Sequence, residues 1–260
     1  MGFLKGKKFL IIGISSVRSI AFGIAKSLYN QKAELGFVCQ NEKIRKKIKK
    51  LVEPMKSCIV LCCDVSNDKN IKKLFIDLGQ VWKKFDGLVH AIAYCPKQYF
   101  NGDFIDNITR EGFNISHEIS SYSFIGLVKA CRTMLNNFSS LLTLSYLGSQ
   151  RVVPNYNVMG LAKASLEASV RYMASSLGKE NIRVNAISSS PIKTISSYKI
   201  TNFNKIRNCS YASSFLKNSV TSENIGNVAS FLLSDLSLGI TGSVIYVDNG
   251  FNVSSMNNIQ

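Results

Sequence analysis

The chain has 260 residues, of which 46% are hydrophobic and 18% are charged, and its formal net charge is +16 at pH 7. This composition is typical of a globular protein and excludes an intrinsically disordered chain. No apolar run approaches the roughly 20 residues of a membrane-spanning helix, so membrane insertion is not expected.

Strand-like apolar runs alternate with helical patterns along the chain. The strand-like segments are Lys8–Ile12, Leu35–Cys39, Cys58–Cys63, Leu88–Ala93, Leu141–Leu144, Arg183–Ile187 and Ser243–Val247. The helical segments are Ile20–Tyr29, Glu42–Val52, Ile71–Trp82, Glu111–Leu135 (one or two helices), Asn155–Leu177 and Ser222–Leu233. This alternation predicts an α/β fold with a doubly wound parallel sheet, Rossmann-like, in a single domain spanning residues 1–260.

In such a fold, ligands bind beyond the carboxyl ends of the strands. One long stretch, about residues 193–219, is rich in Ser, Asn and Lys and lacks a clear pattern. A loop of that length in a compact domain is usually functional, and we interpret it as a substrate lid over the site.

The charge and the cysteines give weaker signals. A net charge of +16 permits nucleic-acid binding or an acidic protein partner, but no nucleic-acid recognition motif is present and the abundance of Lys, Asn and Ile indicates a compositional bias. The seven cysteines without CxxC spacing and the two histidines indicate neither disulfides nor a metal centre. They favour reduced thiols and a cytoplasmic location.

The ends of the first four strands are ordered as a dinucleotide site requires. The first strand ends at Gly13, in a turn that leads into a helix and places backbone N–H groups against a pyrophosphate. The second ends at Gln40, where an acidic residue is usual for a ribose, so charge does not decide between NADH and NADPH. Asp64-Val65 end the third strand and Ile92-Ala93 the fourth. The turn is not GxGxxG, and as a motif it is weak.

Tyr146 follows the fifth predicted strand, and Tyr156 and Lys163 lie seven residues apart on the predicted helix after it. Seven residues at about 100° each return to within roughly 20° of the start, which places Tyr156 and Lys163 on one helix face. We expect the lysine charge to lower the tyrosine pKa and to strengthen its hydrogen bond to a carbonyl oxygen that gains charge. Gly160 is expected to leave this face open for a ligand.

Several segments together resemble the short-chain dehydrogenase/reductase superfamily, and within it the NADH-dependent enoyl-(acyl carrier protein) reductases. The resemblance covers essentially the whole chain. It is carried by Gly13 with Ser19–Ala25, Cys63–Val65, Phe85–His90, Ser120–Phe124, Leu142–Gly148, Pro154–Lys163, Arg183–Ser188, Gly239–Gly242 and Val247-Asp248. Most carbonyl-reducing members have Tyr and Lys four residues apart, whereas the wider spacing here, with a second tyrosine at Tyr146, is typical of enoyl reductases.

The resemblance implies a role for each matching residue. Tyr156 hydrogen-bonds the thioester carbonyl, Lys163 holds the nicotinamide ribose, and Tyr146 is a further active-site tyrosine. Cys95 stands where a backbone group meets the acyl substrate. The residues implied to contact NAD are Gly13, Ser19, Ile20, Gln40, Asp64, Val65, Ile92, Lys163, Ile192, Lys193, Thr194, Ile195 and Ser196. NADH is the implied cofactor and NADPH the less favoured one, the partner is an acidic acyl carrier protein, and the assembly is a homotetramer.

Three positions depart from the family pattern. Ala93 replaces a glycine beside the nicotinamide, Ser189-Ser190 replace Ala-Gly, and Asn249 replaces a glycine after Asp248. Two alternatives therefore stand beside the enoyl reductase: a carbonyl-reducing dehydrogenase of the same fold, which the Tyr–Lys spacing disfavours, and a degenerate, non-catalytic NAD-binding protein, which Ala93 favours.

Overall fold

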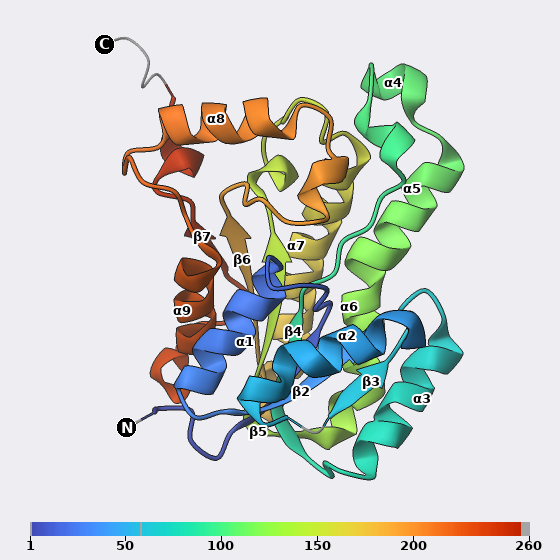
Figure 1. The fold of residues 1–260 in the computed structure, drawn as a ribbon, viewed down its shortest axis with the longest axis vertical. Coiled ribbons are helices and arrows are strands. Elements are labelled where there is room, and N and C mark those ends of the chain that lie inside the picture. Colours follow the sequence, from blue (N-terminus) through green and yellow to red (C-terminus); the bar gives the residue numbers. More distant parts are fainter. Residues whose placement is uncertain (1, 58, 256–260) are drawn as a thin grey trace.

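The computed structural model describes residues 2–57 and 59–255, and its seven strands form one parallel sheet (Figure 1). The strand order is β3-β2-β1-β4-β5-β6-β7, with the change of direction between β1 and β4. The strands are β1 Lys8–Ile12, β2 Glu34–Cys39, β3 Val60–Cys62, β4 Phe85–His90, β5 Leu135–Ser145, β6 Arg183–Ser189 and β7 Val244–Val247. The predicted doubly wound α/β fold is thereby confirmed.

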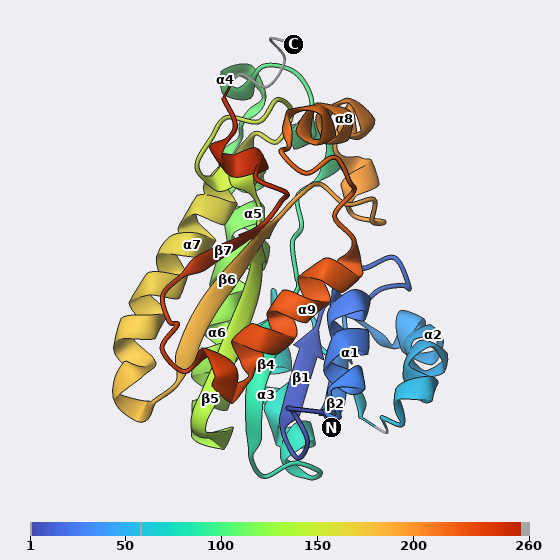
Figure 2. The same cartoon turned by 90° about the vertical axis from the view of Figure 1, so that its left-hand side faces the viewer.

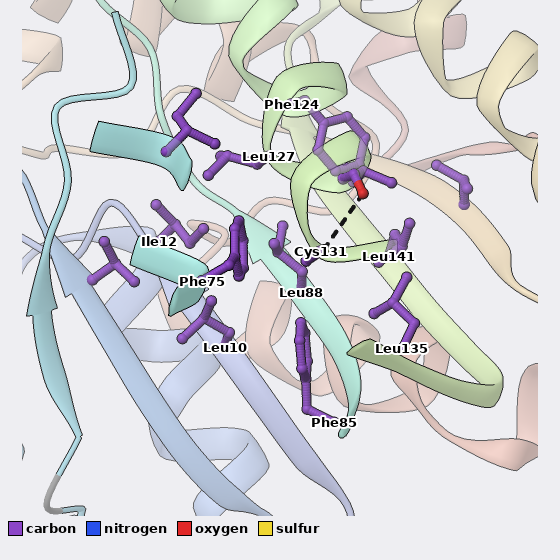
Figure 3. Packing of buried hydrophobic residues seen from close by; sticks show 14 of the residues in the cluster. Leu10, Ile12, Phe75, Phe85, Leu88, Phe124, Leu127, Cys131, Leu135 and Leu141 are labelled. Carbon is purple, nitrogen blue, oxygen red and sulfur yellow. Dashed lines mark hydrogen bonds between the residues drawn. The ribbon is translucent and has the colours of Figure 1, made fainter. Parts of the chain in front are cut away.

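Helices cover both faces of this sheet (Figure 2). Alternate residues of β1 point to opposite sides, so Phe9 and Ile11 pack in the core beneath α1 and α9, whereas Leu10 and Ile12 pack with α3 and α6. Figure 3 shows the second of these cores, where Phe75 of α3, Phe85 of β4 and Phe124 of α6 lie among the buried residues. Because both faces are buried, the central strands are continuous apolar runs, which is why the sequence revealed them.

The nine α-helices of the described residues are α1 Ile20–Asn30, α2 Glu42–Val52, α3 Asp68–Gly79, α4 Phe104–Asn107, α5 Arg110–His117, α6 Ser123–Cys131, α7 Val158–Leu177, α8 Phe203–Ser213 and α9 Ser222–Leu233. Side-chain caps fix several helix starts: Ser19 accepts from the Phe22 N–H, Asn67 accepts from the N–H of Lys69, and Thr221 forms a capping box with Asn224. No helix of residues 2–57 and 59–255 is long and apolar enough to cross a bilayer.

Some predicted boundaries are wrong. Strand β5 begins at Leu135 rather than Leu141, because Leu135 pairs with Phe85 across a bulge in β4–β5. The segment predicted as one or two helices, Glu111–Leu135, contains two, α5 and α6, separated by a π-helix at Glu118–Tyr122. Its predicted end is wrong, because Leu135 belongs to β5. The predicted third strand started at Cys58, which lies outside the described residues.

The stretch 193–219 is not a structureless loop. It contains α8, which begins at Phe203 and lies across the carboxyl end of the sheet (Figure 1). Only Phe203 and Ser210 of this helix are buried. Its apolar periodicity is therefore weak, and the sequence pattern did not reveal it.

Candidate active site

A cavity of about 230 Å³ opens where the carboxyl ends of β1, β4, β5 and β6 meet. This is the switch point of the sheet, where an open α/β fold leaves a crevice. Its lining comes from the segments that follow these four strands, from α1 and α7, and from the 194–206 region. Among the lining residues are Gly13, Ser19, Ile20, Ile92, Cys95, Tyr146, Tyr156, Lys163, Ile192, Thr194 and Ser196.

Gly13 closes β1 in a conformation that other residues rarely adopt. Its φ angle is 104°, and a Cβ atom at this position would lie 2.3 Å from the carbonyl oxygen of Ala91. The chain therefore passes directly against the segment after β4 and turns into α1 within a few residues. The N-terminus of α1 consequently faces the cavity, which Ser19 and Ile20 line.

The two tyrosines meet in this cavity. Their ring centroids lie 4.9 Å apart with an interplanar angle of 74°, an edge-to-face arrangement. The side chain of Tyr156 is 7% exposed, and the Tyr146 hydroxyl is buried without a hydrogen-bond partner among the described residues. A buried, unpartnered hydroxyl in a cavity wall is a group available to a ligand.

The predicted place of Tyr156 on a helix face is wrong. Helix α7 begins at Val158, not at Asn155, because Asn155 and Asn157 have positive φ angles of 62° and 42° that interrupt a helical backbone. Asparagine is among the residues that tolerate such angles best. Tyr156 therefore lies in the turn before the helix, and this turn, rather than helical phase, places it in the same cavity as Lys163.

The expectation for Gly160 is also corrected. A Cβ at Gly160 would lie 2.7 Å from the carbonyl oxygen of Gly148, and a Cβ at Gly148 would lie 2.4 Å from the Tyr156 ring. The two glycines thus allow the turn after β5 to pack on α7, with the Tyr156 ring against that turn. Gly160 permits a close backbone approach, not the approach of a ligand.

Substitution of Gly160 by alanine is expected to lower the free energy of unfolding by about 1–3 kcal/mol, because the new methyl group meets a backbone oxygen that moves only with the turn. Gly178→Ala is the matched control, since a Cβ at Gly178 would have no neighbouring atom within 4 Å and the residue has a helical φ of −58°. We expect it to raise stability by about 0.5 kcal/mol. Urea unfolding of both variants measures this, and equal stabilities would contradict the packing role of Gly160.

Burial dominates the ionisation of the three side chains. It raises the pKa of Tyr156 far above its ordinary value and raises that of Tyr146 to about 12. It lowers the pKa of Lys163 to about 8, against the opposing influence of Glu167. The predicted lowering of the tyrosine pKa by the lysine is therefore wrong in this structure: Tyr156 is a neutral phenol, a hydrogen-bond donor.

Lys163 is 5% exposed, and its ammonium donates to the carbonyl oxygen of Leu144 at 2.8 Å. This hydrogen bond joins α7 to the end of β5 and holds the Lys163 side chain in place at the cavity wall. An ammonium has three N–H donors, and among the described residues only the Leu144 carbonyl oxygen accepts from this one. Two donors therefore remain for a ligand. Lys163 is thus a charged donor held at the wall of the cavity.

The other predicted cofactor contacts divide into two groups. Ile92, Ile192, Thr194 and Ser196 line the cavity. Cys95, the predicted substrate contact, is also buried in its wall. Gln40, Asp64, Val65, Lys193 and Ile195 do not line it. Gln40 is exposed just after β2, Asp64 accepts from Ser66, and Val65 packs its side chain into the core. These three lie at the ends of β2 and β3, on the side of the sheet beyond Gly13.

Known proteins are similar to this chain in both sequence and fold. Residues 13–252 match a family model described as enoyl-(acyl carrier protein) reductase. The chain belongs to the enoyl-(acyl carrier protein) reductase family. It is 63% identical over 259 residues to the NADH-dependent enoyl-(acyl carrier protein) reductase FabI of Buchnera aphidicola subsp. Schizaphis graminum, with 100% of both chains covered. It is 51% identical over 260 residues to FabI of Escherichia coli, covering 100% of this chain and 99% of the relative.

Solved structures of the enoyl-(acyl carrier protein) reductase family agree with the fold. The Aquifex aeolicus enzyme has a TM-score of 0.95 at 41% identity, covering 98% of this chain and 100% of that one. The reductase of Anaplasma phagocytophilum, solved in complex with NAD, has a TM-score of 0.94 at 38% identity, covering 99% of this chain and 96% of that one.

Several lining residues of this reductase-family chain were not predicted from the sequence. They form the apolar part of the wall and include Tyr94, Phe100, Val153, Met159, Ile200, Phe203 and Ile206. Phe203 and Ile206 lie three residues apart, a helical spacing that was the one available signal. The rest are single apolar residues, in loops and short helical turns except for Met159 in the first turn of α7, and only the folded chain brings them together.

The departures from the family pattern have separate environments. Ala93, Ser189 and Ser190 line the cavity. Asn249 has a φ of 57°, and its side-chain amide donates to the carbonyl oxygen of Asn218 at 2.6 Å. Asparagine thus adopts the left-handed backbone that a glycine takes at little cost, and it adds a tie to the neighbouring loop.

Proposed function

We propose that the chain reduces the C2=C3 double bond of trans-2-enoyl thioesters of acyl carrier protein with NADH, the last step of the fatty-acid elongation cycle. One observation carries this proposal: Tyr146, Tyr156 and Lys163 line one cavity, with the Tyr146 hydroxyl buried and unpartnered among the described residues. Membership of the enoyl-(acyl carrier protein) reductase family supports it.

The cavity suits a dinucleotide. None of the described residues that line it is acidic, while Lys163 and Lys199 are cationic, which fits a pyrophosphate. The N-terminus of α1, with Ser19 and Ile20, would hold the phosphates, and Lys163 would hold the nicotinamide ribose. Gln40 and Asp64 would meet the adenosine, and Ile92, Ile192, Thr194 and Ser196 would enclose the nicotinamide half. When bound, NADH supplies the hydride that C3 of the enoyl thioester takes up.

The residues of the chain then act on the thioester oxygen. As negative charge accumulates there, the neutral phenol of Tyr156 donates a hydrogen bond to it, which its raised pKa permits across the physiological range. The Lys163 ammonium adds a positive charge in the same water-poor cavity. Uptake of one proton from solvent at C2 then converts the enolate to the saturated acyl thioester. Tyr146 is a second donor in reach of the same space, and the Cys95 backbone would contact the acyl group.

The apolar wall suits the acyl chain. Phe100, Met159, Phe203 and Ile206 give it an aliphatic and aromatic lining. Above it, Lys199 lies 5.0 Å from the centre of the Tyr94 ring, and Thr201 hydrogen-bonds Asn101, so the 193–219 region rests on the loop after β4. We propose that this region acts as the lid and excludes water during reduction.

A single comparison of substrates tests the function. Loss of NADH absorbance is measured with a trans-2-enoyl thioester and with a 3-ketoacyl thioester, each also with NADPH. We expect consumption only with the enoyl thioester, and faster with NADH. Consumption with the ketoacyl substrate alone would instead establish a carbonyl reductase, and none with either, from protein that binds NADH, would indicate a degenerate binding protein.

Partners and assembly follow as further parts of the proposal. An acidic acyl carrier protein would deliver the substrate, which gives the net charge of +16 a use. A homotetramer is supported by exposed large apolar side chains on the adjoining helices α5 and α7, such as Phe113, Leu161 and Tyr172, the last 81% exposed. A cytoplasmic location is supported by the free thiols of the described cysteines.

A further inference from the structure

A carboxylate is buried behind the catalytic side chains. Glu167 lies on α7, one turn after Lys163, and is 4% exposed. Its Oε1 atom accepts hydrogen bonds from the hydroxyls of Ser145 at 2.5 Å and Ser149 at 2.6 Å. Its Oε2 atom accepts from the side-chain amide of Gln150 at 3.3 Å. Three donors from one short segment thus converge on one carboxylate.

That segment carries Tyr146. Ser145 ends β5 and immediately precedes Tyr146, and Ser149 follows it in the turn, where the Ser149 N–H also bonds the carbonyl oxygen of Tyr146. Glu167 therefore ties the 145–150 segment to α7 on both sides of Tyr146. Since the Tyr146 hydroxyl has no partner among the described residues, the placement of its ring depends on the backbone that Glu167 holds and on contact with Tyr156.

The charge of Glu167 has no ion-pair partner within 4 Å among the described side chains. The cation it acts on is Lys163, whose pKa it raises against the effect of burial. The Arg171 guanidinium is a second cation nearby, and it donates to the backbone carbonyl oxygen of Glu167 at 3.2 Å, not to its carboxylate. The other ionisable groups around these two are Tyr146, Tyr156, Tyr246 on β7 and His90 on β4. His90 is neutral, because burial and the charge of Lys163 lower its pKa to about 3. The three tyrosines have raised pKa values and are neutral as well. Glu167 is thus the anion that lies one helical turn from the buried ammonium.

We infer that Glu167 is a positioning residue of the proposed reductase: its carboxylate holds the Tyr146 segment and places a negative charge one helical turn from the buried Lys163 ammonium. The inference rests on the proposed function for its catalytic part. Its electrostatic part concerns cofactor binding alone and is measurable without turnover.

The two parts predict different effects for two substitutions. Glu167→Gln keeps the size and an acceptor oxygen for the serines but removes the charge. Ser149→Ala keeps the charge but removes one of the three bonds. With the charge gone, Lys163 loses its proton at lower pH. The alkaline limb of kcat/KM for NADH, expected near pH 8 in the unmodified protein, should shift down by about half a pH unit or more.

Ser149→Ala should leave that limb in place and lower kcat about threefold to tenfold, since one charge-assisted bond that positions the segment is lost. Glu167→Asp, which keeps the charge, should restore most of the pH profile. A Glu167→Gln profile that coincides with that of the unmodified protein would overturn the electrostatic part. An unchanged kcat in the Ser145→Ala/Ser149→Ala double variant would overturn the positioning part, and this variant also serves if Glu167→Gln does not fold.

NADH fluorescence titration across pH separates failure of this inference from failure of the proposed function. If the unmodified protein binds NADH but reduces no enoyl thioester, the proposed reaction is wrong, yet the pH dependence of NADH affinity still reports Lys163. In that case, NADH affinity that falls at lower pH in Glu167→Gln than in the unmodified protein supports the electrostatic part. Identical pH dependence of NADH affinity in the two proteins overturns it. Urea unfolding of each variant shows whether a kinetic change exceeds what lost stability alone would cause.

Discussion

Replacing Tyr156 with phenylalanine is expected to lower kcat by about 100-fold or more while the affinity for NADH stays within about twofold. The hydroxyl is the donor placed to hydrogen-bond the thioester oxygen as charge develops on it. Its removal therefore destabilises the transition state but does not change the contacts that hold NADH. Steady-state kinetics with an enoyl thioester, together with NADH titration by fluorescence, separates the two quantities.

The matched control for this substitution is Tyr172→Phe. Tyr172 is also on the Tyr156–Leu177 stretch of chain but is 81% exposed and is not among the residues that line the cavity. The Tyr172→Phe substitution should leave both kcat and NADH affinity of the purified protein unchanged. If Tyr156→Phe retained full turnover, the assignment of the donor would be wrong, and Tyr146 would be the next residue to test.

Replacing Lys163 with methionine is expected to weaken NADH binding by about tenfold to 100-fold, because a charged donor to the nicotinamide ribose is lost. Methionine fills similar space, so the cavity wall is preserved. The carbonyl oxygen of Leu144 loses its partner at 2.8 Å, which lowers stability in addition. Isothermal titration with NADH measures the affinity directly.

Lys179→Met is the control for the loss of one positive charge, since Lys179 is exposed beyond the end of α7. It should bind NADH as the unmodified protein does. Equal loss of NADH affinity in Tyr156→Phe and Lys163→Met would contradict the separate roles proposed for the two side chains.

The sequence was sufficient to predict the fold and to place part of the predicted site at one edge of the sheet. Alternating buried strands and helices dictate a parallel sheet, and a parallel sheet brings every strand's carboxyl end to one edge. Gly13, Ile92 and Tyr146 had to lie near that edge once their strands were placed. Their meeting in one cavity therefore follows from topology and requires no knowledge of side-chain packing.

What the sequence did not reveal depends on contacts between distant segments. Helix α7, which carries Lys163, begins at Val158 and not at the predicted Asn155. The reason is that Asn155 and Asn157 adopt positive φ angles, which a pattern of apolar residues does not encode. Gly160 serves a backbone approach to Gly148, which belongs to the turn after β5. The raised pKa of Tyr156 depends on its burial, a property of the assembled cavity. The role of Glu167 likewise emerges only when β5 and α7 are packed.

The measurement that tests the proposed reaction most directly follows the hydride itself. The protein is incubated with a trans-2-enoyl thioester and NADH deuterated at both C4 positions, and the product is analysed by mass spectrometry and NMR. We expect a saturated thioester with one deuterium at C3. A thioester that keeps its double bond, or a saturated thioester without deuterium at C3, would contradict the proposed enoyl reduction.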